Sequence, residues 1–149
     1  MKQNNGMTLI VKTVTRMTVW LIILYGIYII LHGHLTPGGG FGGGVVIALA
    51  FLNVMLAYGR KFTQEWLNIK FLEDMESASA MLFLIIGIAG MAFGGSFLAN
   101  FIGHGTPFRL LSSGNILVLN IIIGLKVSMS LFLVVWVLAS VKTEGEDKK

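Results

Sequence analysis

The sequence reads HGHLTPGGGFGGG from His32 to Gly44, between two strongly apolar stretches. Seven of these thirteen positions are Gly and one is Pro. Glycine lets the backbone turn sharply and approach a neighbour closely, and Pro37 cannot continue a preceding helix. The stretch therefore predicts a break between two membrane helices. Such backbone is tolerated at membrane depth only where protein or a water-lined cavity shields it.

The composition supports a membrane protein. Of the 149 residues, 55% are hydrophobic and 12% are charged, whereas soluble domains carry about 25% charged residues. The absence of Cys excludes disulfides, thiolate metal ligands and iron–sulfur ligation. The net charge of +4 does not indicate nucleic-acid binding, because the basic residues lie at the ends of apolar runs. This length predicts one transmembrane domain over residues 1–149.

Four apolar runs are candidates for membrane spans. They cover residues 12–31, 41–58, 77–100 and 115–141. A span needs about 20 residues to cross about 30 Å of hydrocarbon, so the second run suffices only if its Gly-rich start is helical or buried in protein. The first run is long for a signal peptide and no cleavage site follows it, which favours a retained helix. The predicted fold is all-α, with about four transmembrane helices, a Gly-rich outer loop between the first two, and no sheet.

The distribution of Lys and Arg predicts the orientation. Nine of them lie in the N-terminal flank, the connection between the second and third spans, and the charged tail 142–149, against only Arg109 in the other two connections. We therefore expect a multi-pass protein of the cell membrane with both termini in the cytoplasm. His32, His34 and His104 then lie on the outer side.

The connection between the second and third spans has an amphipathic pattern. Phe62, Trp66 and Ile69 follow one another at helical spacing, which indicates a short helix on the inner membrane surface. A solvated loop with scattered aromatic residues is the alternative.

The glycines formally match a dinucleotide fingerprint at Gly38, Gly40 and Gly43. That motif requires a preceding strand within a βαβ unit, and the pattern here is helical on both sides. Nucleotide binding is therefore rejected. Two interpretations remain: a flexible outer hairpin, or a packed loop docked against a larger partner, which we favour.

Lys126 is the one fixed charge near the middle of a predicted span. It lies about 16 Å from the start of its helix, where a charge costs about 2.5–3.5 kcal/mol. It should therefore face a cavity or a partner, and either pair with an acid or relay protons. Because none of the predicted spans contains Asp or Glu, a carboxylate partner is expected from another subunit. Snorkelling towards the headgroups is the alternative.

Polar residues accompany Lys126 in the fourth run. Asn115 lies three turns before it on the same face, Ser130 lies one turn after it, and Asn120 points to another helix. Such side chains suit a hard cation such as Na⁺, but they also join helices, at about 0.6 kcal/mol each. His32 and His34 form an H-x-H pair without a further ligand nearby, so a metal site is not expected; an outer mouth for protons is the functional alternative. Gly90 and Gly94 form a GxxxG pair, which predicts a close helix contact.

Two stretches resemble a known family. HGHLTPGGGFGGGVVIALAFLNVMLAYG resembles the signature of the MnhB component of the Mrp-type, or Mnh-type, multisubunit Na⁺/H⁺ antiporters, with the PGGGF-x-GG core at residues 37–44. NIIIGLKVSMSLFLVV, from Asn120, is similar to the version found in archaeal membrane-bound hydrogenases and related sulfur reductases.

The resemblance implies a small membrane subunit that binds no cofactor itself and is not catalytic by itself, although its host could be a membrane-bound hydrogenase. The partners would be the other membrane subunits of an antiporter module that transports Na⁺ and H⁺, one of them supplying a carboxylate near Lys126. The alternatives are a purely structural assembly subunit and an autonomous carrier. The residues expected in the ion path or its frame are Lys126, Asn115, Asn120, Ser130, His34, Pro37, Gly38, Gly39, Gly40, Phe41, Gly43 and Gly44.

Overall fold

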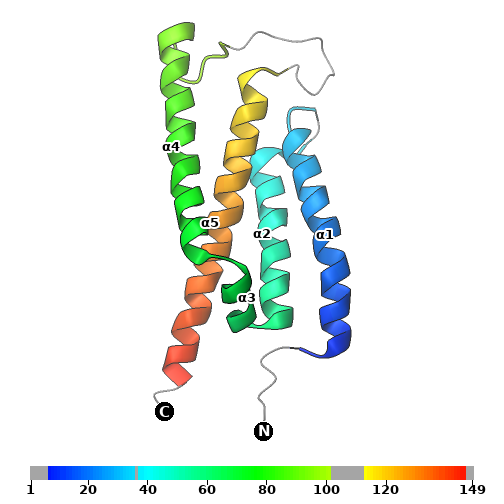
Figure 1. Ribbon diagram of the computed structural model, residues 1–149. Coiled ribbons are helices and arrows are strands. Elements are labelled where there is room, and N and C mark those ends of the chain that lie inside the picture. The colour runs from blue at the N-terminus through cyan, green and yellow to red at the C-terminus, as the bar shows by residue number, and fades with distance from the viewer. Residues whose placement is uncertain (1–6, 36, 102–112, 147–149) are drawn as a thin grey trace.

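The computed structural model describes residues 7–35, 37–101 and 113–146 (Figure 1). Its helices are α1 Leu9–Leu31, α2 Gly39–Tyr58, α3 Arg60–Trp66, α4 Ile69–Gly94 and α5 Asn115–Glu146. The described ranges contain no strand. Four helices are long and apolar enough to cross a membrane: α1, α2, α4 and the Asn115–Val141 part of α5. The expected all-α fold with four spans is confirmed.

The four long helices form an open row. Helix α1 packs on α2, α2 on α5, and α5 on α4, so that α1 and α4 lie at opposite edges (Figure 1). In the central helix α2, 44% of the most apolar window is buried, against 22% in α1 and 17% in α4. The edge helices therefore keep broad apolar faces that only lipid or other membrane chains can cover.

The glycine stretch is helical, which corrects the expected loop. The connection after α1 ends at Gly38, and α2 begins at Gly39 rather than at residue 41. Gly38 and Gly39 have φ values of 150° and 77°, which L side chains rarely adopt. Since the following glycines belong to the helix and pack against its neighbours, the second span reaches 20 residues.

Helix α4 lies earlier in the chain than residues 77–100. It begins at Ile69, after Asn68, whose Oδ1 accepts a hydrogen bond from the Phe71 N–H at 3.4 Å. Such a cap satisfies one of the free N–H groups of the first turn. The helix ends at Gly94, where Gly95 adopts the left-handed conformation that commonly ends helices.

The GxxxG face of α4 packs against the segment that follows the helix and contains Leu98 and Ala99. The Leu98 N–H donates to the Gly87 carbonyl at 3.3 Å, and a Cβ on Gly90 would lie 2.7 Å from the Ala99 nitrogen. The predicted close contact therefore exists, but its partner is the segment after α4 rather than a helix.

The predicted inner helix forms only in part. Helix α3 runs from Arg60 to Trp66, and Ile69 already belongs to α4. The Arg60 guanidinium lies 4.7 Å from the Trp136 ring centroid, which attaches α3 to α5. Along the helix axes, the same end of the molecule holds helix α3, the start of α1 and the end of α5 (Figure 1).

Candidate functional site

An ion pair joins the edge helix α4 to its neighbour α5. The Lys126 Nζ on α5 contacts the Glu76 Oε1 on α4. The premise that no span contains Asp or Glu is therefore wrong, and Lys126 has a carboxylate partner in its own chain. A further carboxylate from another subunit stays a prediction. Because α4 begins at Ile69, Glu76 lies about 10 Å inside that helix rather than in a loop.

Sequence analysis missed Glu76 because it placed the start of the third span one residue after it. A signal for the earlier start was present in the sequence. Asn68 is a good helix N-cap, and Leu72 and Ser79, seven residues apart, form the buried stripe of an amphipathic helix that contains Glu76.

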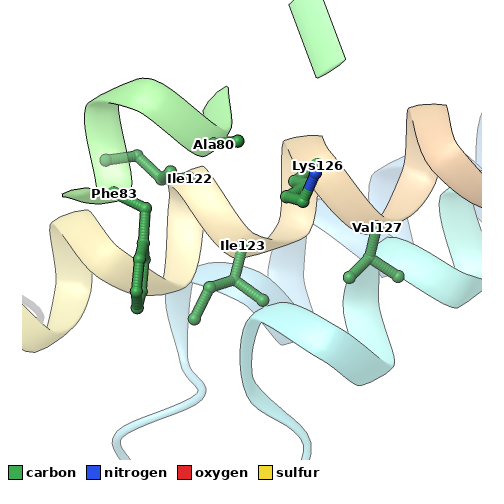
Figure 2. Close-up of a pocket in the computed structure, with 6 residues that line it drawn as sticks. All are labelled: Ala80, Phe83, Ile122, Ile123, Lys126 and Val127. Carbon is green, nitrogen blue, oxygen red and sulfur yellow. The ribbon is translucent and has the colours of Figure 1, made fainter. Parts of the chain in front are cut away.

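Lys126 lines a cavity of about 290 Å³ between α4 and α5, and its partner Glu76 lies one turn of α4 before the lining residue Ala80. Figure 2 shows Ala80 and Phe83 of α4 above α5, with the Lys126 nitrogen on the side of α5 that faces α4. The other lining residues are Ile122, Ile123 and Val127. Lys126 therefore faces a cavity, as expected, and it is the charged group of an otherwise apolar lining, in which charge interactions are weakly screened.

Both charged side chains remain accessible. The side chain of Lys126 is 42% exposed and that of Glu76 is 26% exposed. A lysine side chain has a flexible stem of four carbons and an ammonium with three hydrogen-bond donors. The Lys126 ammonium can therefore reach a second acceptor beside the row without a backbone movement.

Asn115 also lies on the α4 side of α5, as its spacing from Lys126 predicts. It is 2% exposed. Its Nδ2 donates to the Ala99 carbonyl at 3.0 Å, and its backbone N–H donates to the Asn100 Oδ1 at 3.1 Å. Asn115 thus ties the start of α5 to the segment after α4, some three turns from the ion pair.

The other two predicted polar residues of α5 differ from each other. Asn120 faces α2, where its Oδ1 accepts a hydrogen bond from the Gly40 N–H at 3.4 Å. The first N–H groups of a helix lack intrahelical partners, so Asn120 caps α2 from the neighbouring helix. Ser130 is half-buried, and within the described ranges it makes no side-chain hydrogen bond.

The glycines of α2 divide between two neighbours. A Cβ on Gly40 would overlap the Asn120 carbonyl, and one on Gly44 would lie 2.7 Å from the Gly124 carbonyl, both on α5. A Cβ on Gly43 would lie 2.7 Å from the Gly26 carbonyl on α1. These glycines therefore pack against the chain's own helices, whereas the expected contact of the stretch with a larger partner stays a prediction.

The remaining residues of the predicted glycine site point outward. Pro37 and Gly38 are exposed, Gly39 is half-buried, and the side chain of Phe41 is 66% exposed. These residues surround the start of α2, at the end of the long helices that is opposite to α3 (Figure 1). Phe41 is thus a large apolar side chain that is available to a neighbouring chain.

The two described His lie near the same end. His32 stacks on Tyr28 with ring centroids 4.1 Å apart, and its Nδ1 lies 3.0 Å from the Tyr28 carbonyl. His34 is half-buried. His104 and Arg109 lie outside the described residues. Within the described ranges, no three His, Asp or Glu side chains lie close enough together to hold a metal ion.

The sequence of this chain is similar to those of known membrane proteins. Residues 10–133 match the model of a domain related to the MnhB subunit of Na⁺/H⁺ antiporters. The chain is 42% identical over 113 residues to an uncharacterized protein of Methanocaldococcus jannaschii, and 31% identical over 104 residues to the B component of the Na⁺/H⁺ antiporter of Bacillus subtilis. The first alignment covers 72% of this chain and 43% of the relative; the second covers 70% and 72%.

A solved structure shares the fold. A chain of the membrane-bound sulfane sulfur reductase, an archaeal respiratory membrane complex, superimposes with a TM-score of 0.72 at 33% sequence identity. The match covers 89% of this chain and 60% of that one. The chain thus spans less than two thirds of the length of the archaeal proteins it resembles here.

Proposed function

Because the family model covers most of its length, the chain belongs to the MnhB family, and we propose that it serves as a small membrane subunit of a multisubunit Na⁺/H⁺ antiporter module. In this proposal it helps to form the path for Na⁺ and H⁺ between subunits and binds no cofactor itself. The observation that carries the proposal is the accessible Lys126–Glu76 pair beside an apolar cavity at the edge of the row.

The open row favours a subunit over an autonomous carrier. A carrier needs a path enclosed on all sides, whereas the Lys126–Glu76 pair lies between two helices with a partly exposed ammonium. The broad apolar face of α4 beside it includes Leu84, Ile88 and Met91, each at least half exposed. A neighbouring subunit that covers this face would also close the cavity.

The proposed mechanism is electrostatic. When Lys126 contacts Glu76, the two charges neutralise each other. A carboxylate of the adjacent subunit would attract the ammonium away from Glu76, and Glu76 would then be free to accept a proton or Na⁺. The movement of one side chain would thus couple the charge state of the neighbouring channel to the occupancy of Glu76, as intramembrane charges do in transporters.

The proposed topology follows from the charges. We place the protein in the cell membrane with both termini in the cytoplasm, because the basic residues concentrate at the start of α1, at the end of α5 and around α3. The start of α2, with Phe41 and His34, then faces outward and shapes the outer mouth.

The test is Na⁺/H⁺ exchange by the whole complex in inverted membrane vesicles. Lys126→Ala should lower exchange by about 5- to 150-fold, the range of a coupling free energy between two sites. Lys61→Ala, which removes an exposed charge on α3, should leave exchange unchanged, and the amount of assembled complex should match in both variants. A Lys126→Ala complex that assembles and exchanges at the full rate would refute the proposal.

A structural role is the second candidate, and the match to a respiratory membrane complex is compatible with it as well. In that case the chain would hold together a complex such as a membrane-bound hydrogenase or sulfur reductase, with Lys126–Glu76 as a static salt bridge. Lys126→Arg separates the two, because Arg keeps the charge but binds a carboxylate bidentately and so holds Glu76 more firmly. A static bridge predicts an unchanged rate and pH profile of exchange, whereas the proposed release of Glu76 predicts slower exchange and a shifted pH profile.

A further inference from the structure

A second cavity lies on the other side of the row, remote from the ion pair. Its volume is about 490 Å³, and its walls come from α1, from the end of α2 and from α3. Four aromatic side chains frame it: Trp20, Tyr58, Phe62 and Trp66. Arg16 also lines it. No step of the proposed ion path uses these residues.

Arg16, which lines this cavity, has a second cation one turn away on α1. Lys12 and Arg16 are one turn apart on α1 and so occupy the same face. The Lys12 ammonium lies 5.8 Å from the Tyr58 ring centroid, which holds it near the cavity wall. Within the described part of the chain, neither cation forms an ion pair with an acidic side chain. Among the residues that the structure describes, the two positive charges therefore have no acidic partner.

Ring stacking and a hydrogen bond hold the aromatic side chains around the cavity in place. Tyr58 stacks on Phe62 with ring centroids 4.7 Å apart, and its hydroxyl donates to the Lys12 carbonyl at 3.1 Å. The base of the cavity is apolar, because Val19 and Val54 are buried. Trp20 and Trp66 are 65% and 50% exposed at its edge. Aromatic side chains with one wet and one apolar end concentrate at the membrane–water interface.

These features fit an interfacial lipid. We propose that the cavity binds one phospholipid with an anionic headgroup, whose phosphate lies between Lys12 and Arg16 and whose acyl chain runs along Trp20 towards Val54. The level in the membrane agrees with this assignment, since α1 starts and α2 ends here and the short helix α3 follows. Basic residues beside a membrane helix attract anionic lipids, and an apolar base below two cations matches the two parts of a phospholipid.

Native mass spectrometry of the purified complex tests the site. The complex is delipidated in detergent and titrated with phosphatidylglycerol or with phosphatidylcholine. We expect one tightly held phosphatidylglycerol at this subunit. The double variant Lys12→Gln with Arg16→Gln should bind it about tenfold more weakly or worse. The matched control Lys61→Gln neutralises an exposed cation on α3 that does not line the cavity, and it should bind phosphatidylglycerol like the unaltered complex.

Several outcomes would overturn the assignment. Equal binding of phosphatidylcholine, or undiminished binding by the double variant, would exclude a site for an anionic headgroup. Complete displacement by millimolar inorganic phosphate would indicate a phosphate site without lipid. Because the chain contains no Cys, Trp66→Cys offers a single thiol in this subunit, and its quantitative crosslinking to a neighbouring subunit would show that a protein fills the cavity.

Discussion

Adding one methyl group at Gly44 should separate the two central helices of the row. A Cβ there would lie 2.7 Å from the Gly124 carbonyl and 2.9 Å from the Val127 Cβ, both on α5. Ordinary contacts begin at 3.4 Å, so the helices must move apart by about 0.7 Å, the difference between 3.4 and 2.7 Å. Because one of the atoms is backbone, a side-chain rotation cannot relieve the overlap.

Gly42 provides the matched control in the same helix. A Cβ on Gly42 has no neighbouring heavy atom within 4 Å. Both substitutions replace Gly by Ala within α2, so the gain in helix propensity, at most about 1 kcal/mol, largely cancels between them. The difference between the variants is then the cost of overpacking, about 1–3 kcal/mol. The midpoint of the complex should therefore be a few degrees lower for Gly44→Ala than for Gly42→Ala.

The measurement is thermal denaturation of the detergent-solubilised complex, followed by the loss of the intact complex on size-exclusion chromatography. Gly42→Ala should match the unaltered protein or exceed it slightly. If Gly44→Ala proves as stable as Gly42→Ala, the close contact between α2 and α5 does not exist, and the packing described for the glycine stretch is wrong.

Two further predictions concern the polar contacts between helices. Lys126→Met and Glu76→Gln should each destabilise the complex, because each leaves the remaining group of the pair without its partner, and the double variant should recover part of the loss. A double-mutant cycle on thermal stability should give a coupling free energy of about 1–3 kcal/mol. Breaking a fully buried pair costs about 3–5 kcal/mol, and we expect less here because both side chains are partly exposed. Asn120→Leu removes the acceptor at the start of α2 and should cost about 0.5–2 kcal/mol, as the loss of a helix cap does; Ser130→Ala is the control and should change the midpoint little, and equal midpoints for the two would contradict the cap.

The open row explains why a subunit of this size needs neighbours. Helix α2 contacts α1 on one side and α5 on the other, so it is well buried. The outer faces of α1 and α4 keep large apolar side chains exposed, among them Leu24 and Met81. In the membrane these faces can meet either lipid or protein. The cavity framed by Trp20 would hold lipid, and the face of α4 beside Lys126 would hold a partner subunit.

The number and type of the spans were determined by the sequence alone. Crossing a membrane requires about 20 apolar residues in succession, which is a local property that can be summed along the chain. The same reasoning identified Lys126 as unusual, because a charge inside an apolar run is visible without any neighbour. It also predicted that the glycine stretch must be helical or shielded if the second span is to cross the membrane.

The contacts were decided only by the tertiary structure. Whether Gly43 meets α1 while Gly44 meets α5 depends on the rotation of α2 about its own axis, which a nearly uniform apolar helix does not encode in its pattern. The partner of Lys126 depends on where α4 begins and on how α4 and α5 are aligned, because Glu76 lies 50 residues away in the chain. Hydropathy accumulates over neighbouring residues, but an ion pair forms between side chains that packing brings together, and therefore only the folded chain shows that this ammonium has a carboxylate of its own.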